Sequence, residues 1–311
     1  MSIAKFEYIV TEQDQGLPIK GLLRREFHFS TRLMNKLKSH DCVSLNGIFV
    51  KLHIVPQAGD LIKVKMPTEK SDFIPENIPI SIVYEDDSLL IINKQPGFVV
   101  HPTKGHPNRT IANGIMKYLM DQGKSFKIRF VNRLDMDTSG LLVVAKNSHS
   151  QDDFSKQMAQ NKVVKRYVAI VNGHLDEGEG VINLPIGKAE EDKVNRVVRE
   201  DGLPSITHYK VIERYTHRGL NRAGALIENK YTQVELVLET GRTHQIRVHM
   251  SYMGHPVVGD ELYGGANPVL IERQALHAKY LSFKHPVTGE HMEVFASLPE
   301  DMIALIEKIR G

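Results

Sequence analysis

Cysteine and long apolar runs are scarce in this chain of 311 residues. Its single cysteine, Cys42, excludes intramolecular disulfides and zinc clusters built from cysteine. No apolar run approaches the ~18 residues of a membrane-spanning helix, and the amino terminus lacks the charged-then-apolar pattern of a signal peptide. We therefore expect a cytoplasmic protein with no membrane partner.

Two further absences concern ligands. No Gly-rich loop ends in Lys-Ser/Thr, so a nucleotide cofactor is not expected. Tryptophan is missing and aromatic residues make up only 7% of the chain. This argues weakly against a sheet that binds nucleic acid mainly by stacking bases.

The net charge of +3 conceals an uneven distribution of basic residues. Residues 1–70 hold 11 Lys and Arg against 7 Asp and Glu, whereas the remainder holds 29 against 30. Residues 22–39 read as a helix with an apolar face. Its basic side chains are Arg24, Arg25, Arg32, Lys36 and Lys38. Such a face is either an ordinary solvated surface or a set of contacts to RNA phosphates, which give affinity without reading sequence.

The first 70 residues have the order of a small α+β domain. After the basic helix, residues 43–50 read as two short strands about Asn46-Gly47, and Gly59-Asp60 precedes a strand at 61–64. This order resembles the S4 RNA-binding domain over roughly residues 14–67. Prolines and charged residues without periodicity at 66–79 indicate a linker. We expect an S4-like domain at 1–70, a linker at 71–81 and a catalytic domain at 82–311.

One carboxylate stands at a rigid position in the second domain. Residues 132–146 begin with a polar turn and end in the apolar run Leu141–Ala145, which reads as a buried strand. From spacing alone, Asp135 either caps the turn at Thr138-Ser139-Gly140 or is a functional group. The pattern Arg133-Leu134-Asp135-x-x-Thr138-Ser139-Gly140-Leu141 resembles the signature of the RluA-type pseudouridine synthases. In that family this Asp is the catalytic residue.

Two later stretches resemble motifs of the same family. In the strand expected at 165–171, Lys165-x-Tyr167 is similar to the second motif, which places the tyrosine in the active site. Residues 241–249, Gly-Arg-Thr-His-Gln-Ile-Arg-Val-His, resemble the third motif, and Gly254–Asp260 extends it. We expect a helix here, capped by Thr243. Its two histidines are five residues apart, whereas zinc-binding histidines on a helix are about four apart, so no metal site is predicted.

The resemblance implies isomerisation of uridine in RNA to pseudouridine without an added cofactor. The N1–C1′ bond breaks, the uracil turns and C5 bonds to C1′, so positive charge develops on the sugar, which a carboxylate can trap or stabilise. Asp135 would act as nucleophile or general base at the sugar, Tyr167 would lie against the uracil, and Arg247 would pair with Asp135 and keep it ionised. Further RNA contacts are expected from Arg133, Arg242 and His244.

The fold class expected is α+β, with a mixed, largely antiparallel sheet in the catalytic domain. The expected partner is large-subunit rRNA, with tRNA as the second candidate, and the expected state is a monomer. Two other readings stay open: an RNA-binding ribosome assembly factor without turnover on this scaffold, and a nucleoside hydrolase, which would need a second carboxylate or a metal. The family usually has His where this chain has Asn132, which puts any proton-transfer role of that position in doubt. The charged residues 188–202 predict a mobile loop.

Overall fold

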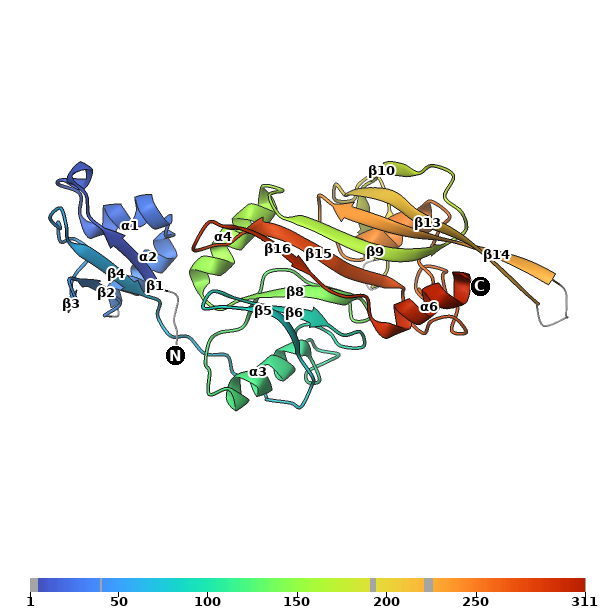
Figure 1. Cartoon of the computed structure of the whole chain (residues 1–311), viewed down its shortest axis with the longest axis horizontal. Helices are drawn as coiled ribbons and strands as arrows, with labels where there is room; N and C mark the ends of the chain where they lie inside the picture. Colours follow the sequence, from blue (N-terminus) through green and yellow to red (C-terminus); the bar gives the residue numbers. More distant parts are fainter. Residues whose placement is uncertain (1–4, 40, 191–193, 221–225, 311) are drawn as a thin grey trace.

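A computed structural model describes residues 5–39, 41–190, 194–220 and 226–310. The elements form a small domain at the amino-terminal end and a larger domain built on one extended sheet (Figure 1). Within the described ranges no helix is long and apolar enough to cross a membrane.

The small domain packs two helices on one face of an antiparallel sheet with strand order β1-β4-β2-β3. Its elements are β1 (Lys5–Ile9), a 3-10 turn (Glu12–Asp14), α1 (Ile19–Phe27), α2 (Thr31–Ser39), β2 (Val43–Leu45), β3 (Ile48–Phe49) and β4 (Leu61–Lys65). The single helix expected over 22–39 is therefore wrong. His28 takes a left-handed backbone conformation (φ 51°), which ends α1 and lets α2 start in a new direction.

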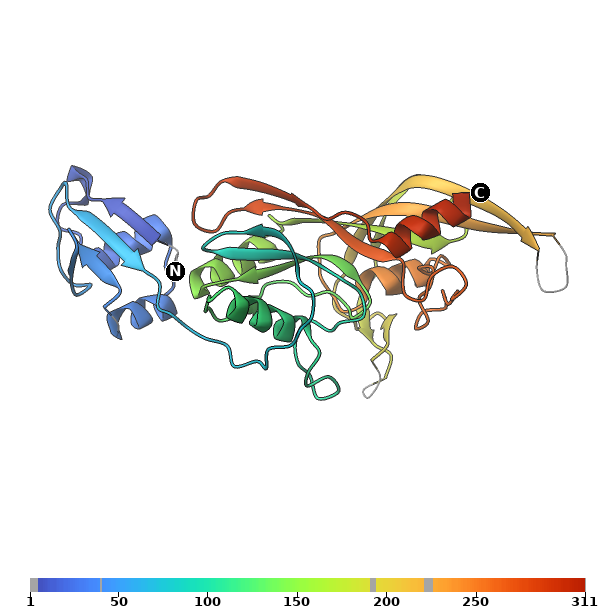
Figure 2. The same ribbon diagram turned by 60° about the horizontal axis from the view of Figure 1, so that its bottom comes forward.

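The connector at 66–80 contains no helix or strand, but it is not a free tether. The Ser71 hydroxyl accepts a hydrogen bond from Ile128 N at 2.9 Å, and Asn113 Nδ2 donates to Ile74 O at 2.8 Å. The connector thus lies along the larger domain, as Figure 2 shows. The first strand of that domain begins at Ser81.

The larger domain is a mixed, mostly antiparallel sheet with the path β10-β13-β14-β9-β15-β8-β6-β5. Its strands are β5 (Ser81–Glu85), β6 (Leu89–Lys94), β7 (Arg129–Phe130), β8 (Ser139–Ala145), β9 (Val164–Asn172), β10 (Glu179–Asn183), β13 (Ile206–Leu220), β14 (Leu226–Leu238), β15 (Leu276–Lys284) and β16 (His291–Phe295). Only the β8–β15 pair among these is parallel. The expected α+β class with a largely antiparallel sheet is confirmed.

Helices cover both faces of this sheet because β8 is apolar on both sides. Leu142 and Val144 pack with α3 (Ile111–Asp121), whereas Leu141 and Val143 pack with α4 (Ser148–Ala159) and the β15–β16 hairpin. The α5 (Gln245–Tyr252) and α6 (Glu300–Arg310) helices join the core formed by β9, β13 and β14.

Two local expectations need correction. Residues 188–202, expected to form a mobile loop, include part of a short antiparallel pair, β11 (Ile186–Lys188) with β12 (Arg196–Val198), so the stretch is not loop alone. Residues 191–193 lie outside the described part. The expected cap Thr243 is also wrong, because His244 holds the N-cap position of α5.

Candidate active site

Asp135 lies in the turn that joins β7 to β8. The turn is closed by Thr138 N, which donates to Asp135 O at 3.1 Å. It is anchored from below by Lys94, whose buried ammonium donates to Met136 O at 2.7 Å and to Thr138 O at 2.9 Å. Burial lowers the pKa of Lys94 to about 7. The turn that carries Asp135 is thus fixed both by a hydrogen bond within it and by the hydrogen bonds from Lys94.

Gly140 allows this turn to sit against the next strand. Its φ is +115°, and a Cβ at this position would lie 2.3 Å from Ala278 O of β15. No side chain fits between two backbones at that separation. The glycine of the Thr-Ser-Gly signature therefore permits the parallel β8–β15 contact directly behind Asp135.

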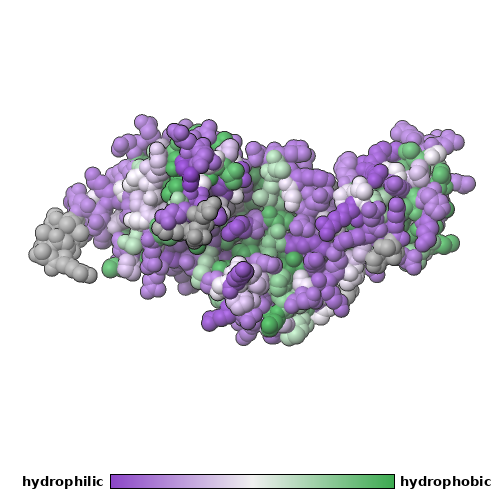
Figure 3. Space-filling model, turned by 180° about the vertical axis from the view of Figure 1, so that it is seen from behind, coloured by the Kyte–Doolittle hydropathy of each residue, from purple (hydrophilic) through white to green (hydrophobic). Residues whose placement is uncertain are grey.

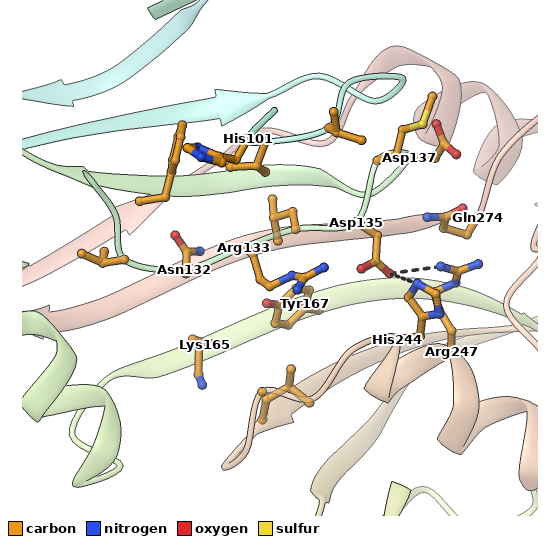
Figure 4. A pocket seen from close by; sticks show the side chains of 18 of the residues that line it. His101, Asn132, Arg133, Asp135, Asp137, Lys165, Tyr167, His244, Arg247 and Gln274 are labelled. Atoms are coloured by element: carbon orange, nitrogen blue, oxygen red, sulfur yellow. Dashed lines mark hydrogen bonds and ion pairs between the residues drawn. The ribbon is translucent and has the colours of Figure 1, made fainter. Parts of the chain in front are cut away.

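Arg247 reaches Asp135 from α5. Arg247 Nη1 donates to Asp135 Oδ2 at 3.1 Å, so the predicted ion pair is present (Figure 4). The other side of the guanidinium forms a fork with Asp260, with Nε–Oδ2 at 2.7 Å and Nη2–Oδ1 at 2.9 Å. Burial alone would lower the pKa of Arg247, but its bonds to Asp260 and the charge of Asp135 raise it well above its ordinary value. The arginine is therefore permanently charged and fixed in direction.

Asp260 is the residue that the sequence reasoning missed. It is fully buried and lies in the Gly259-Asp260 turn that was recognised only as an extension of the third motif. The signal was present, because a buried arginine needs an anionic partner that is not itself the reactive group. Asp260 holds Arg247 from the buried side, whereas the Asp135 side chain is partly exposed, at 19%.

His244 and Tyr263 complete the cluster. His244 has a left-handed backbone (φ 57°), which turns its imidazole toward the site, with Nε2 3.9 Å from Asp135 Oδ2. Its Nδ1 hydrogen-bonds with the Tyr263 hydroxyl at 2.9 Å. The Tyr263 ring also lies 5.1 Å from the Arg247 guanidinium carbon, in a cation–π contact. Burial lowers the pKa of His244, so the imidazole is neutral near pH 7.

Asp135, His244 and Arg247 face a cleft of about 830 Å³. Tyr167, on β9, lines it beside Asp135, and burial raises the pKa of its phenol, which therefore stays protonated. Much of the remaining wall is apolar, with contributions from Val100, Phe130 and Leu134 among others. On the side opposite to Figure 1, apolar surface occupies the middle of the molecule between hydrophilic flanks (Figure 3). A cleft of this size and character suits an extruded nucleobase.

Asn132 points away from Asp135 and has a structural partner. Its Oδ1 accepts from Val143 N at 2.8 Å, and its Nδ2 donates to Leu141 O at 3.1 Å. The side chain thus bonds to the backbone of β8 as a neighbouring strand would, and it lies apart from Asp135 (Figure 4). An amide is sufficient for these two hydrogen bonds, and they do not require a titratable group such as the histidine that the family usually has here.

The predicted RNA-binding residues fall into separate places. Arg133 and Arg242 are exposed where the cleft opens, and His244 lies inside it. Arg24 and Lys38 are exposed on the small domain, and Arg32 and Lys36 face a groove between the domains. Arg25 forms an ion pair with the buried Asp14 of its own domain, and Lys36 pairs with Glu69.

The third motif also contains buried residues whose hydrogen bonds stabilise the fold. His249 is buried, with Nδ1 bonded to Thr207 Oγ1 at 2.9 Å and Nε2 to Leu184 O at 3.0 Å. Gln245 donates to Ile206 O at 2.9 Å. In the described ranges no group of three or more His, Cys, Asp or Glu could hold a metal ion.

Comparisons with known proteins agree with this geometry. Residues 88–252 match the family of RNA pseudouridylate synthases. The chain is 40% identical over 285 residues to the uncharacterised RNA pseudouridine synthase YjbO of Bacillus subtilis, which covers 91% of this chain and 96% of that protein. It is 37% identical over 286 residues to the ribosomal large subunit pseudouridine synthase D of Haemophilus ducreyi, covering 87% of this chain and 84% of that one. The solved structure of the human RNA pseudouridylate synthase domain containing 1 matches with a TM-score of 0.56 and 28% identity, covering 75% of this chain and 95% of that one. The chain therefore belongs to the RluA-type RNA pseudouridine synthases and is an isomerase.

Proposed function

We propose that Asp135 is the catalytic carboxylate and that the enzyme isomerises uridines of large-subunit rRNA. The assignment of Asp135 rests on how the nitrogens of Arg247 are shared between two carboxylates. Asp260 satisfies two of the guanidinium nitrogens, and the remaining one is aimed at Asp135 in the cleft. A carboxylate paired with this charged arginine is thus held next to the space that a nucleotide would enter, and it acts at the C1′ end of the sugar as positive charge develops there.

The other groups would hold the detached uracil. The Tyr167 ring lies in the cleft wall beside Asp135, where a base can pack against its face. Apolar side chains line the same cleft beside Tyr167 and Asp135, among them Leu134, which is 7% exposed. An apolar wall limits the access of water, which would otherwise trap the sugar cation and release free uracil. The base then bonds to C1′ through C5, the proton at C5 leaves to solvent, and N1 takes up a proton from solvent, so that substrate and product are isomers.

The choice of rRNA rests on relatives. Several similar proteins, including the one from Haemophilus ducreyi, carry the name ribosomal large subunit pseudouridine synthase D. The S4-like domain at residues 1–70 would anchor this RNA, because the basic excess of the chain lies there.

The test is tritium release from RNA that carries 5-³H-uridine, with free uracil measured in the same samples. Asp135→Asn should abolish tritium release while leaving RNA affinity close to that of the unaltered enzyme. Asp137→Asn is the matched control, since Asp137 lies two positions away in the same turn and also lines the cleft. It should retain turnover. Full activity of Asp135→Asn would refute the assignment.

The same assay separates the rival functions. A nucleoside hydrolase would release uracil and leave no pseudouridine in the RNA. An assembly factor would bind RNA without tritium release from any transcript. The substrate is tested by comparing unmodified large-subunit rRNA with unmodified tRNA, and faster release from tRNA would contradict the rRNA assignment.

A further inference from the structure

A second groove lies between the two domains, outside the catalytic cleft. It has a volume of about 520 Å³, and its charged lining comes from Arg32, Lys36, Glu69, Lys127, Arg129 and Asp152. Arg32 and Lys36 belong to α2 of the small domain, Arg129 belongs to β7, and Lys127 lies two residues before β7 begins. Its walls therefore carry more positive than negative charge, although the larger domain as a whole has no basic excess.

The two walls are held in a fixed relation by contacts on either side. On one side, the His149 ring of α4 contacts the rings of Phe6 and Phe29, each with a centroid separation of 5.1 Å. On the other side, Glu69 of the connector bonds Lys36 Nζ at 2.8 Å and also pairs with Arg129. One carboxylate thus bridges the small domain and the larger one. The small domain is docked on the larger one, next to α4 (Figure 1).

The single negative charge of Glu69 does not neutralise the positive charge of the two arginines in the groove. Arg129 is only 8% exposed, and burial together with the like charge of nearby Arg32 lowers its pKa. Glu69 is shared between Lys36 and Arg129, and Arg32 and Lys127 remain exposed at the walls. Two guanidinium groups that face one space, one of them buried, favour an anion between them.

The groove adjoins the catalytic cleft. Ile128 lines both spaces, and its neighbours Lys127 and Arg129 line the groove while Phe130 lines the cleft. The segment that carries the groove's basic residues therefore leads directly into the turn of Asp135. An RNA strand whose target nucleotide occupies the cleft would have its flanking backbone close to this groove.

We propose that the groove between the domains binds backbone phosphates of the RNA strand that flanks the target uridine. Arg32 and Lys127 make the phosphate contacts, and Arg129 supplies buried positive charge behind them. Glu69 fixes the position of the small domain relative to the cleft, so that the two parts of the enzyme hold one strand in register. This inference rests on the proposed function, because it takes RNA as the substrate.

The experiment uses the full-length protein and a transcript of large-subunit rRNA. The double variant Arg32→Gln/Lys127→Gln should flatten the slope of log affinity against log salt by about 0.7–0.9 for each lost phosphate contact. Between 50 and 200 mM salt, the loss of affinity should accordingly be about tenfold smaller than for the unaltered enzyme. In the tritium assay the variant should raise KM for the transcript without lowering kcat.

The matched control is Lys63→Gln in the same small domain. Lys63 is exposed on the sheet face opposite the helices and has an ion pair with Glu7 at 3.1 Å, which parallels the pairing of Lys36. It should keep the salt slope and KM of the unaltered enzyme. The proposal is overturned if the double variant keeps the full slope, or if Lys63→Gln flattens the slope equally. Absence of tritium release from the unaltered enzyme would instead refute the proposed function, while the salt dependence of RNA binding would still test the groove.

Discussion

Replacing Arg247 with lysine keeps the charge but removes the geometry on which the site depends. The guanidinium makes two bonds to Asp260 and one to Asp135, with N–O distances of 2.7, 2.9 and 3.1 Å. A lysine ammonium is a point charge that cannot form the fork with Asp260 and still face Asp135. It will pair with the fully buried Asp260, because an unpaired charge costs most there.

The size of the effect follows from the bonds lost. A hydrogen bond to a charged group contributes about 1.5–3 kcal/mol. Losing the bond that orients Asp135 should therefore raise the barrier by about 2–3 kcal/mol, which is about 30- to 150-fold in kcat/KM. The free energy of unfolding should fall by about 1–3 kcal/mol, less than the ~3–5 kcal/mol for removing one partner of a buried pair, since the charge remains.

The assay is kcat/KM from tritium release, with urea denaturation of the same samples. Arg166→Lys serves as the control, because Arg166 lies on β9 and makes surface contacts away from the cleft, an ion pair with Glu235 at 3.3 Å and a cation–π contact with the Tyr280 ring at 5.2 Å. Surface pairs contribute about 0–1 kcal/mol, so this variant should change neither quantity much. An Arg247→Lys enzyme with the kcat/KM of Arg166→Lys would show that the fork is not needed to orient Asp135.

Three further predictions concern the site and its support. Tyr167→Phe should cost less kcat/KM than Tyr167→Ala, whose loss of stacking is worth about 1–3 kcal/mol; equal losses would assign the function to the hydroxyl. Gly140→Ala should lower the free energy of unfolding by about 2–5 kcal/mol, because its Cβ would clash with Ala278 O and its φ is +115°. Gly289→Ala is the control, since Gly289 has a φ of +72° but open space around it, and it should cost only about 1 kcal/mol. Equal losses for the two variants in urea denaturation would show that the clash does not matter. Burial lowers the pKa of His277 to about 4. Between pH ~6.5 and ~4 the unfolded chain therefore binds a proton at this residue that the folded chain does not bind. As the pH falls from ~6.5 to ~4, the free energy of unfolding should decrease by on the order of 3 kcal/mol. A His277→Gln protein should lose this part of the pH dependence, and an unchanged profile in urea denaturation at each pH would contradict it.

Local pattern was sufficient where neighbouring residues decide the conformation. Asn46-Gly47 forms the expected turn between β2 and β3 because both residues adopt positive φ. The apolar run Leu141–Ala145 is buried on both faces, as a central strand must be. Where the sequence reasoning placed one helix over 22–39, the apolar spacing continued through His28, and only the packing of α1 and α2 on the sheet required a break there.

The sequence by itself determined the family and the class of the fold, because contiguous motifs that resemble known ones carry both. Its resemblance to the family also predicted the pairing of Asp135 with Arg247, which belong to two separate motifs. The tertiary structure alone decided what surrounds that pair. Asp260 reaches Arg247 from a separate turn, and Lys94 reaches the Asp135 turn from β6. The groove of Arg32 and Arg129 joins residues of two domains. Charges far apart in the chain interact only when folding removes water between them, and no local spacing records that distance.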